Sequence, residues 1–181
     1  LLGNEDNYSQ FLLRHTLVFI IFYLSAIVFF KTLQKRFNNF FIAFFGTLLF
    51  IFSPRIYGDS FHNNKDIIFL SLTVFSIYFA FKIFDKKKIK HLFLFSFFAA
   101  LATSTRIMGL FLPISIILFL YLQTLNSMHV KNHKFNFLII IFYSMSLRIH
   151  WPYLWEDPVS NFFEFLSNSK NWIYSYYILF N

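Results

Sequence analysis

Long apolar runs, separated by short polar segments, dominate the sequence. The runs cover roughly residues 17–30, 40–52, 67–84, 92–102, 110–125 and 135–147. Run 40–52 offers only Gly46 and Thr47 as a polar face, whereas a helix of a soluble bundle needs polar residues at helical spacing. The pattern therefore predicts an all-α fold, a polytopic transmembrane helical bundle with about six membrane helices.

The lengths of the runs limit how they cross the membrane. Several are shorter than the ~20 residues that a helix needs to span a hydrocarbon core of ~30 Å, so each must extend into its flanks. Arg14, Arg106 and Arg148 then lie near membrane ends. A long cationic side chain is tolerated there if it reaches water or faces a polar cavity.

Composition supports the membrane reading. Of the 181 residues, 57% are hydrophobic, 31 are Phe and only 13% are charged, against roughly a quarter in ordinary globular chains. The chain has no cysteine, which excludes a disulfide framework, a zinc knuckle and a thiol nucleophile. Its net charge of +8 would suggest a nucleic acid partner in a soluble protein, but the distribution of that charge explains it differently.

The basic residues gather in alternate loops. Segments 31–39, 82–91 and 123–134 carry ten Lys and Arg with one acid, Asp85, while the opposite set of segments carries six bases against seven acids. The positive-inside rule makes the Lys-rich loops cytoplasmic. We therefore expect a multi-pass protein of the cell inner membrane, with both ends of the sequence on the non-cytoplasmic side. Its Lys and Arg side chains are expected to interact with lipid headgroups of the bilayer and not with nucleic acid.

The two ends of the sequence predict a fragment. Leu1 stands where a full chain has Met, and no signal peptide follows. The aromatic run 172–180 resembles the start of another buried segment that stops at Asn181. We expect residues 1–181 to be part of a single transmembrane domain that is truncated at its N-terminus and at its C-terminus.

Segment 53–66 is the most polar outward segment between two apolar runs. Its charged and titratable residues are Arg55, Asp59, His62, Lys65 and Asp66. Arg and Lys side chains can neutralise a phosphate, and a carboxylate or imidazole can move a proton. The residues therefore predict a site that binds an anionic substrate.

A structural interpretation of the same segment stays open. Pro54 and Gly58 are expected to break the helix, which at membrane depth is tolerated where the backbone lines protein or a water-filled cavity. The segment could then be the floor of a pocket. It could equally be an interfacial turn in which Asp66 caps a helix beginning at Ile67, while Arg55 contacts lipid headgroups.

Arg106 is a second candidate, since it lies between two apolar runs joined by almost no loop. An ionisable group at this depth is expensive unless it is paired or solvated, so it is a functional candidate. An anionic ligand is its natural partner. The alternative is a side chain that reaches the interface and pairs with Asp59 or a lipid phosphate.

Segment 148–158 combines aromatic rings with acids. Trp151, Tyr153 and Trp155 suit anchoring at the headgroup level. Alternatively, the rings stack on a sugar or an isoprenoid while Glu156 or Asp157 binds hydroxyls. Elsewhere, His129 and His133 are spaced like a pair of metal ligands, but no third ligand lies nearby. We therefore expect no metal site and no cofactor, although a divalent ion is not excluded.

Several motifs carry a family resemblance. They are Phe-Leu-Leu-Arg-His at 11–15, Ser-Pro-Arg-Ile-Tyr-Gly-Asp-Ser-Phe-His-Asn-Asn-Lys-Asp at 53–66, Ser-Thr-Arg-Ile-Met-Gly at 104–109 and Trp-Pro-Tyr-Leu-Trp-Glu-Asp-Pro at 151–158. With these motifs in order, the chain resembles bacterial relatives of the dolichyl-phosphate-mannose protein mannosyltransferases, which are GT-C glycosyltransferases.

The resemblance implies a membrane glycosyltransferase. Such an enzyme moves a sugar from a polyprenyl-phosphate donor to a lipid, glycan or protein acceptor on the outer, periplasmic face. It implies a catalytic acidic residue in a loop upstream of Leu1. We expect Arg55, Lys65 and Arg106 to bind the donor phosphate, and Asp59, His62, Asp66, Trp151 and Trp155 to be candidates for substrate binding.

Two readings from other classes compete with the enzyme. A transporter or flippase could move a lipid or an anion through the same cavity without making a bond, although Pro113 is the only proline inside a run and no repeat is evident. In the other alternative, the protein is a non-catalytic membrane anchor or assembly protein, and its polar segments only cap the helices. It predicts that Arg55 and Arg106 face solvent on unrelated sides.

Overall fold

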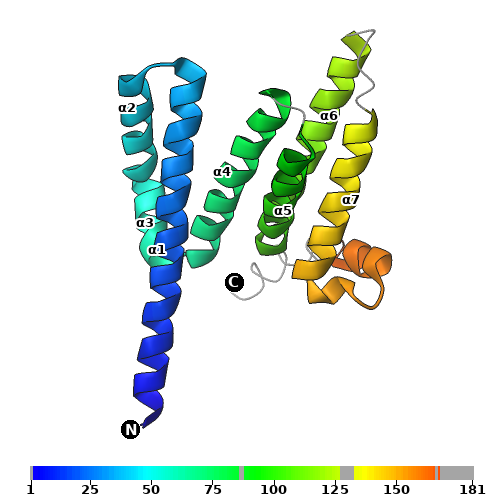
Figure 1. The fold of residues 1–181 in the computed structure, drawn as a ribbon. Coiled ribbons are helices and arrows are strands. Elements are labelled where there is room, and N and C mark those ends of the chain that lie inside the picture. The colour runs from blue at the N-terminus through cyan, green and yellow to red at the C-terminus, as the bar shows by residue number, and fades with distance from the viewer. Residues whose placement is uncertain (1, 86–87, 127–132, 166, 168–181) are drawn as a thin grey trace, which may run out of the picture.

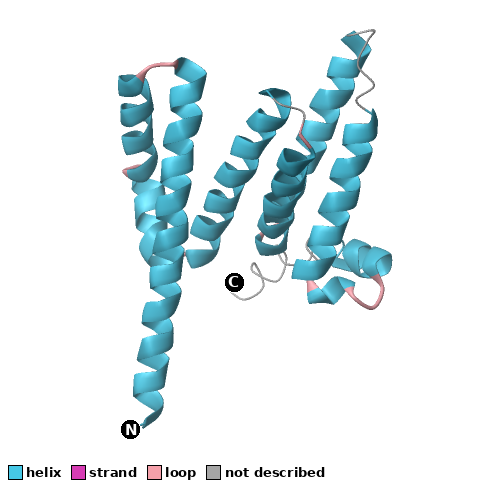
Figure 2. Ribbon diagram, in the orientation of Figure 1, coloured by secondary structure: helices cyan, strands magenta, loops and turns pink. Residues whose placement is uncertain are grey.

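The computed structural model describes residues 2–85, 88–126, 133–165 and 167, and this part of the chain is helical with no strand (Figures 1 and 2). The elements are α1 (Leu2–Phe37), α2 (Phe40–Ile51), α3 (Pro54–His62), α4 (Asn64–Asp85), α5 (Ile89–Thr105), the 3-10 helix η1 (Ile107–Leu110), α6 (Phe111–Asn126), α7 (His133–His150) and the 3-10 helix η2 (Pro152–Leu154). The all-α prediction is confirmed, and each of the predicted apolar runs lies almost wholly within helix.

Fewer helices than predicted are long enough to span a membrane. Within the described residues, α1 and α4 are sufficiently long and apolar, and α2 with α3 adds a third span if the two are taken together across a bend of 53°. Helix α2, with 12 residues, is only about 18 Å long at 1.5 Å per residue. The count of about six membrane helices therefore stays a prediction.

The turn between α1 and α2 is built by two asparagines. Asn38 has a φ of 49°, in the left-handed region that Asn tolerates better than most residues. The side-chain oxygen of Asn39 accepts hydrogen bonds from the backbone N–H groups of Phe41 at 2.9 Å and Ile42 at 3.3 Å. This cap satisfies two donors that the helix itself leaves unpaired, so α2 returns along α1.

Helix α5 is the centre of the packed core. Its Ala99, Ala100 and Ala102 are fully buried, and such small side chains let neighbouring helices approach closely. Here α5 packs between α4 and α7. The hydroxyl of Tyr143 on α7 donates a hydrogen bond of 2.8 Å to the hydroxyl of Thr103 on α5, which fixes the register of these two helices.

The outside of the bundle is apolar. Large side chains such as Phe41, Leu49 and Phe111 are between 64% and 75% exposed, far more apolar surface than a soluble monomer shows. Several hydroxyl groups inside the helices are satisfied within their own helix, as where Ser71 donates to the Ile67 carbonyl at 2.8 Å. Both features fit helices that face acyl chains.

The two ends of the bundle differ in what they carry. The described residues that flank the three Lys-rich loops lie at one end, uppermost in Figure 1, because α1, α4 and α6 all finish there. Helix α3 lies towards the opposite end (Figure 1), and so does η1, because it directly follows the end of α5. The alternation of loops predicted from the sequence therefore agrees with the fold, while the orientation of these ends in a membrane stays a prediction.

Candidate functional site

The polar segment 53–66 is mostly helical. Helix α2 ends at Ile51 and α3 begins at Pro54, with a bend of 53° between them, so the expected break at Pro54 is confirmed. Gly58 lies within α3, so the expected break there is wrong. Proline is favoured at a first helical position because its missing N–H has no partner there in any helix. One glycine inside a helix costs only about 1 kcal/mol. A second interruption comes at Asn63, between α3 and α4.

Asn63 caps α4 and positions Asp66. The backbone N–H of Asp66 donates to the Asn63 side-chain oxygen at 3.4 Å, and the Asn63 amide in return donates to the Asp66 carboxylate. This reciprocal arrangement is similar to a capping box, with an acid three residues after the cap, except that the carboxylate accepts from the Asn63 side-chain amide and not from its backbone N–H. Asp66 therefore does not cap a helix that begins at Ile67; it is held in the first turn of α4 by Asn63.

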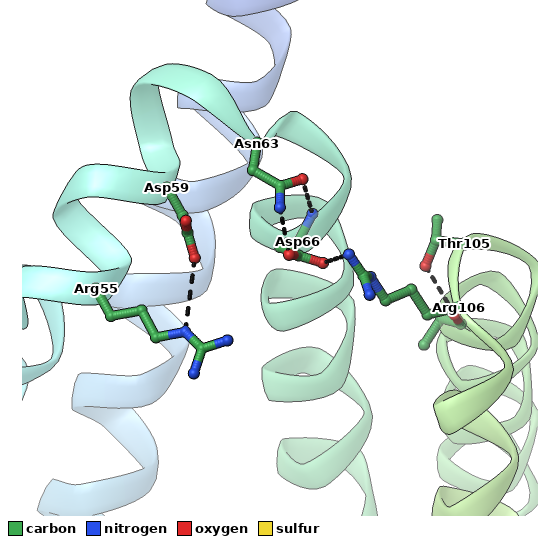
Figure 3. A network of polar contacts seen from close by, with 7 residues as sticks. Arg55, Asp59, Asn63, Asp66, Thr105 and Arg106 are labelled. Carbon is green, nitrogen blue, oxygen red and sulfur yellow. Dashed lines mark hydrogen bonds and ion pairs between the residues drawn. The ribbon is translucent and has the colours of Figure 1, made fainter. Parts of the chain in front are cut away.

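Asp66 also forms an ion pair with Arg106 (Figure 3). Arg106 has an extended backbone, with φ of −147° and ψ of 133°, between the end of α5 and the start of η1. The side chains of Asp66 and Arg106 are 28% and 47% exposed, so the ion pair is partly buried. The expected partner of Arg106 in a structural role was Asp59 or a lipid phosphate; the partner in this structure is Asp66.

Gly109 stabilises the turn that follows Arg106 and so helps to position the Arg106 side chain. Its N–H donates to the Arg106 carbonyl at 2.9 Å. A Cβ added to Gly109 would lie 2.4 Å from the Thr103 nitrogen and 2.6 Å from the Ala102 carbonyl carbon. Because these are backbone atoms of α5, only glycine allows η1 to fold back this closely.

Arg55 and Asp59 lie one turn apart on α3, on the other side of Asp66 from Arg106 (Figure 3). The Arg55 Nε atom is 3.9 Å from an Asp59 carboxylate oxygen, which is a loose contact. The Arg55 side chain is 91% exposed, and a pair this exposed contributes little to stability. Arg55 is therefore available to a further anion.

Lys65 and His62 complete the residues predicted for this segment. Lys65 is exposed in the first turn of α4, and it forms no ion pair within the described part of the chain. His62 ends α3, but its side chain lies outside the described residues. Helical spacing puts position 62 on the face of α3 that carries Arg55 and Asp59. The structure thus brings five of the predicted residues to one end of the bundle: Arg55, Asp59, Lys65, Asp66 and Arg106.

An apolar hollow of about 320 Å³ lies beside α3. Its walls come from α1, from the last turn of α2, from α3 and from Ile67 of α4. Tyr57 and Ser60 line it, and helical spacing puts them on the side of α3 away from Arg55 and Asp59. Helix α3 therefore has a charged face on one side and an apolar hollow on the other.

Trp151 and Trp155 lie elsewhere. Trp151 packs against the core, with its ring 4.9 Å from that of Phe165. Trp155 is 58% exposed, and its ring N–H donates to the Arg148 carbonyl at 2.7 Å. This segment follows α7, which lies beyond α5 from α3 and α4 (Figure 1), so the structure does not bring the two tryptophans to the Asp66–Arg106 pair.

Asp157 of the same segment and Glu164, which follows it, have local partners. A carboxylate oxygen of Asp157 accepts the Ser160 backbone N–H at 3.3 Å, as a helix cap does. The Tyr153 hydroxyl donates to the Glu164 carboxylate at 3.2 Å. Partial desolvation first, and then the Glu164 carboxylate, raise the pKa of Tyr153. These contacts fit the interfacial reading of the segment.

Metal binding has no support in the described part of the chain. No three His, Cys, Asp or Glu side chains gather there as a metal ion would need. His129 and the side chain of His133 lie outside the described residues.

Two features of the site were not predicted from the sequence. The pairing of Asp66 with Arg106 joins residues 40 positions apart, and it depends on α4 and α5 being neighbours. The role of Gly109 depends on a turn that no motif specifies. A signal for α3 did exist, because Arg55, Asp59 and His62 recur at helical spacing.

The comparisons with known proteins bear on the whole of this arrangement. No curated protein and no solved structure matches the chain. The family model of the dolichyl-phosphate-mannose-protein mannosyltransferases matches residues 11–151, which include α2 to α7, most of α1 and the Asp66–Arg106 pair. With most of its length covered by this match, the chain belongs to the dolichyl-phosphate-mannose-protein mannosyltransferase family.

Proposed function

We propose that the protein transfers a sugar from a polyprenyl-phosphate donor to an acceptor on the outer face of the inner membrane. The observation that carries the proposal is the cluster at the end of the bundle opposite the Lys-rich loops. There Arg106 is paired with Asp66, and Arg55 with Lys65 adds exposed positive charge. The family of the chain supports the class of reaction.

The cations fit the charge that such a reaction develops. When the bond between the sugar and the phosphate breaks, negative charge grows on the departing polyprenyl phosphate. Fixed cations that face this charge lower the barrier, because they need no reorganisation during the reaction. In this proposal Arg106, Arg55 and Lys65 bind the phosphate, Arg through two parallel hydrogen bonds and Lys as a point charge.

The acids take supporting roles. Asp66 holds the Arg106 guanidinium in place, and Asp59 does the same loosely for Arg55. Neither is assigned the part of general base. Both carboxylates, together with His62, are proposed to contact substrate hydroxyls.

The apolar part of the donor also needs a place. The hollow of about 320 Å³ between α1 and α3 is lined by Val18, Phe19, Phe22 and Ile67 among others. It reaches the bend after α2, at the same end of the bundle as the charged cluster. An isoprenoid chain that entered there would keep its phosphate at the membrane surface.

The topology completes the proposal. With the Lys-rich loops in the cytoplasm, α3 and η1 lie at the periplasmic surface. The acceptor, whether lipid, glycan or protein, then approaches from the periplasm. No metal or other cofactor is proposed.

The test uses the complete protein in lipid vesicles with a polyprenyl-phosphate donor that carries a radiolabelled sugar. We expect label to move to an acceptor, and Arg106→Ala to lower the rate at least tenfold. Arg148→Ala is the matched control, because it removes the same charge at the same end of the bundle, on α7. Equal rates in the wild type and Arg106→Ala would contradict the phosphate clamp.

A second design separates the clamp from a structural role of Arg106. Removing Arg106 alone leaves Asp66 half-buried without its partner, which destabilises the fold by itself. Asp66→Asn combined with Arg106→Gln removes both charges and should restore stability without restoring transfer. Restored transfer would show that the pair is only structural.

One observation favours a different function. The break between α2 and α3 resembles the interrupted helices with which transporters surround their substrates. A transporter or flippase would move the labelled donor across the vesicle membrane with the sugar still attached. Label that stays on the donor lipid during transport would support this alternative against glycosyl transfer.

A further inference from the structure

The Lys-rich end of the bundle contains a hollow of its own. It lies between the last turns of α1 and α4, has a volume of about 140 Å³, and is lined by Thr32, Lys35, Arg36, Tyr78, Phe81, Lys82 and Asp85. In Figure 1 the upper ends of these two helices diverge. This hollow is at the end of the bundle opposite Asp66 and Arg106, so it is separate from the site already described.

The hollow has a surplus of positive charge. Three cations line it against a single acid, Asp85, and that acid is already shared with Lys35 in an ion pair. Within the described part of the chain, Arg36 and Lys82 have no carboxylate partner. Two full positive charges therefore remain without a counter-ion.

Lys82 is fixed in place rather than loosely solvated. Its ammonium group lies 4.3 Å from the centre of the Tyr78 ring and 5.7 Å from that of Phe79, and the residue is partly buried. Such contacts with ring faces hold a cation without neutralising it. The charge thus stays available, in a defined position, for an anion that enters the hollow.

We propose that Arg36 and Lys82, with Lys35 beside them, bind the phosphate of an anionic phospholipid in this hollow. A guanidinium offers two parallel N–H groups to phosphate oxygens, and an ammonium adds a point charge. Basic pockets between membrane helices on the cytoplasmic side bind the headgroups of such lipids. Phe81, which is 44% exposed, borders the hollow on the side of the apolar helix surface, where acyl chains lie.

The ligand is therefore a membrane lipid and not a soluble phosphate. Both have the phosphate that the cations recognise, but only the lipid also covers the apolar rim that Phe81 and Tyr78 provide. The role of such a lipid is to hold together the ends of α1 and α4, which diverge here. The proposal is independent of the glycosyl transfer proposed above.

The test measures lipid retained by the complete, delipidated protein in detergent, by native mass spectrometry, with phosphatidylglycerol and phosphatidylcholine as probes. We expect phosphatidylglycerol to be retained in preference to phosphatidylcholine. Arg36→Gln and Lys82→Gln should each lower its retention about fivefold, the effect of one basic residue at an anionic membrane surface. Lys90→Gln is the matched control, because Lys90 is exposed at the same end outside the hollow.

Two further variants keep the test sharp if Lys82→Gln weakens the fold. Lys82→Arg keeps the charge and should keep the lipid. Asp85→Asn removes the one competing anion and should raise retention. The proposal is overturned if Lys90→Gln lowers retention as much as Lys82→Gln, if phosphatidylcholine is retained equally, or if inorganic phosphate at equal concentration displaces the lipid.

Discussion

Replacing Gly109 with alanine should destabilise the protein and disturb the site at the same time. The added methyl group would lie 2.4 Å from the Thr103 nitrogen, 2.6 Å from the Ala102 carbonyl carbon and 2.7 Å from the Thr103 Cα. All three are backbone atoms in the last turns of α5, so none can move aside by changing a rotamer. Either η1 must shift away from α5 or the end of α5 must unwind.

The expected magnitude follows from the type of atoms involved. Forcing extra volume into a packed region typically costs about 1–3 kcal/mol, and rigid neighbours put this case at the upper end. We expect Gly109→Ala to lower the free energy of unfolding by about 3 kcal/mol. Because η1 begins directly after Arg106, the same shift should move the guanidinium away from Asp66.

Gly58→Ala provides a matched comparison within the same chain. A Cβ at Gly58 meets no heavy atom within 4 Å, and the residue is inside α3. Alanine is a better helix former than glycine by about 1 kcal/mol, so this substitution should stabilise the protein slightly. Thermal unfolding of the two variants in the same detergent, followed by circular dichroism, should give shifts of opposite sign. A Gly109→Ala protein as stable as the wild type would refute the close approach of η1 to α5.

Three further predictions concern the contacts around the site. Asn63→Ala should lower the free energy of unfolding by about 1 kcal/mol, because α4 loses its cap. Denaturant titration measures this, and an unchanged midpoint would contradict the role of Asn63 as a cap. Tyr143→Phe should lower it by about 0.5–1.5 kcal/mol, because the hydrogen bond to Thr103 is lost; a more stable variant in the same titration would show that this bond is not formed. Asp66→Asn should lower the KM for a polyprenyl-phosphate sugar, because it removes the charge that competes with the phosphate for Arg106 while the amide can still hydrogen-bond Arg106 and substrate hydroxyls. Arg106→Ala should raise the KM, and steady-state kinetics in which both variants shift the KM in the same direction would contradict the phosphate clamp.

The helices that face lipid could be predicted from the sequence alone. Each apolar run is so uniform that only a helix can satisfy its backbone in a membrane. The ends of the helices were less predictable, since run 17–30 is the middle of the much longer α1. A helix continues through polar residues until a cap ends it, and here Asn38 and Asn39 do so.

The charged residues were identified, but their partners were not. Arg55 and Asp59 are one turn apart in sequence, so their contact follows from α3 once the helix is recognised. The ion pair of Asp66 and Arg106 depends on tertiary packing. The short connection between α4 and α5 favours antiparallel neighbours and so puts the start of α4 near the end of α5. It does not specify that these two side chains meet, because that depends on how closely small residues such as Ala99 let the helices approach.

The position of the Asp66–Arg106 pair makes an exchange of anions inexpensive. Asp66 is in the first turn of α4, where the helix dipole favours negative charge, and Arg106 is at the end of α5, where the dipole favours positive charge. Each charge is thus stabilised by its own helix as well as by its partner. A phosphate that binds Arg106 in place of the carboxylate would leave Asp66 supported by Asn63 and by the start of α4. The ion pair therefore keeps the Arg106 guanidinium oriented, while a phosphate can still replace Asp66 as its partner. A cation that is to stabilise the negative charge of a departing phosphate needs both properties.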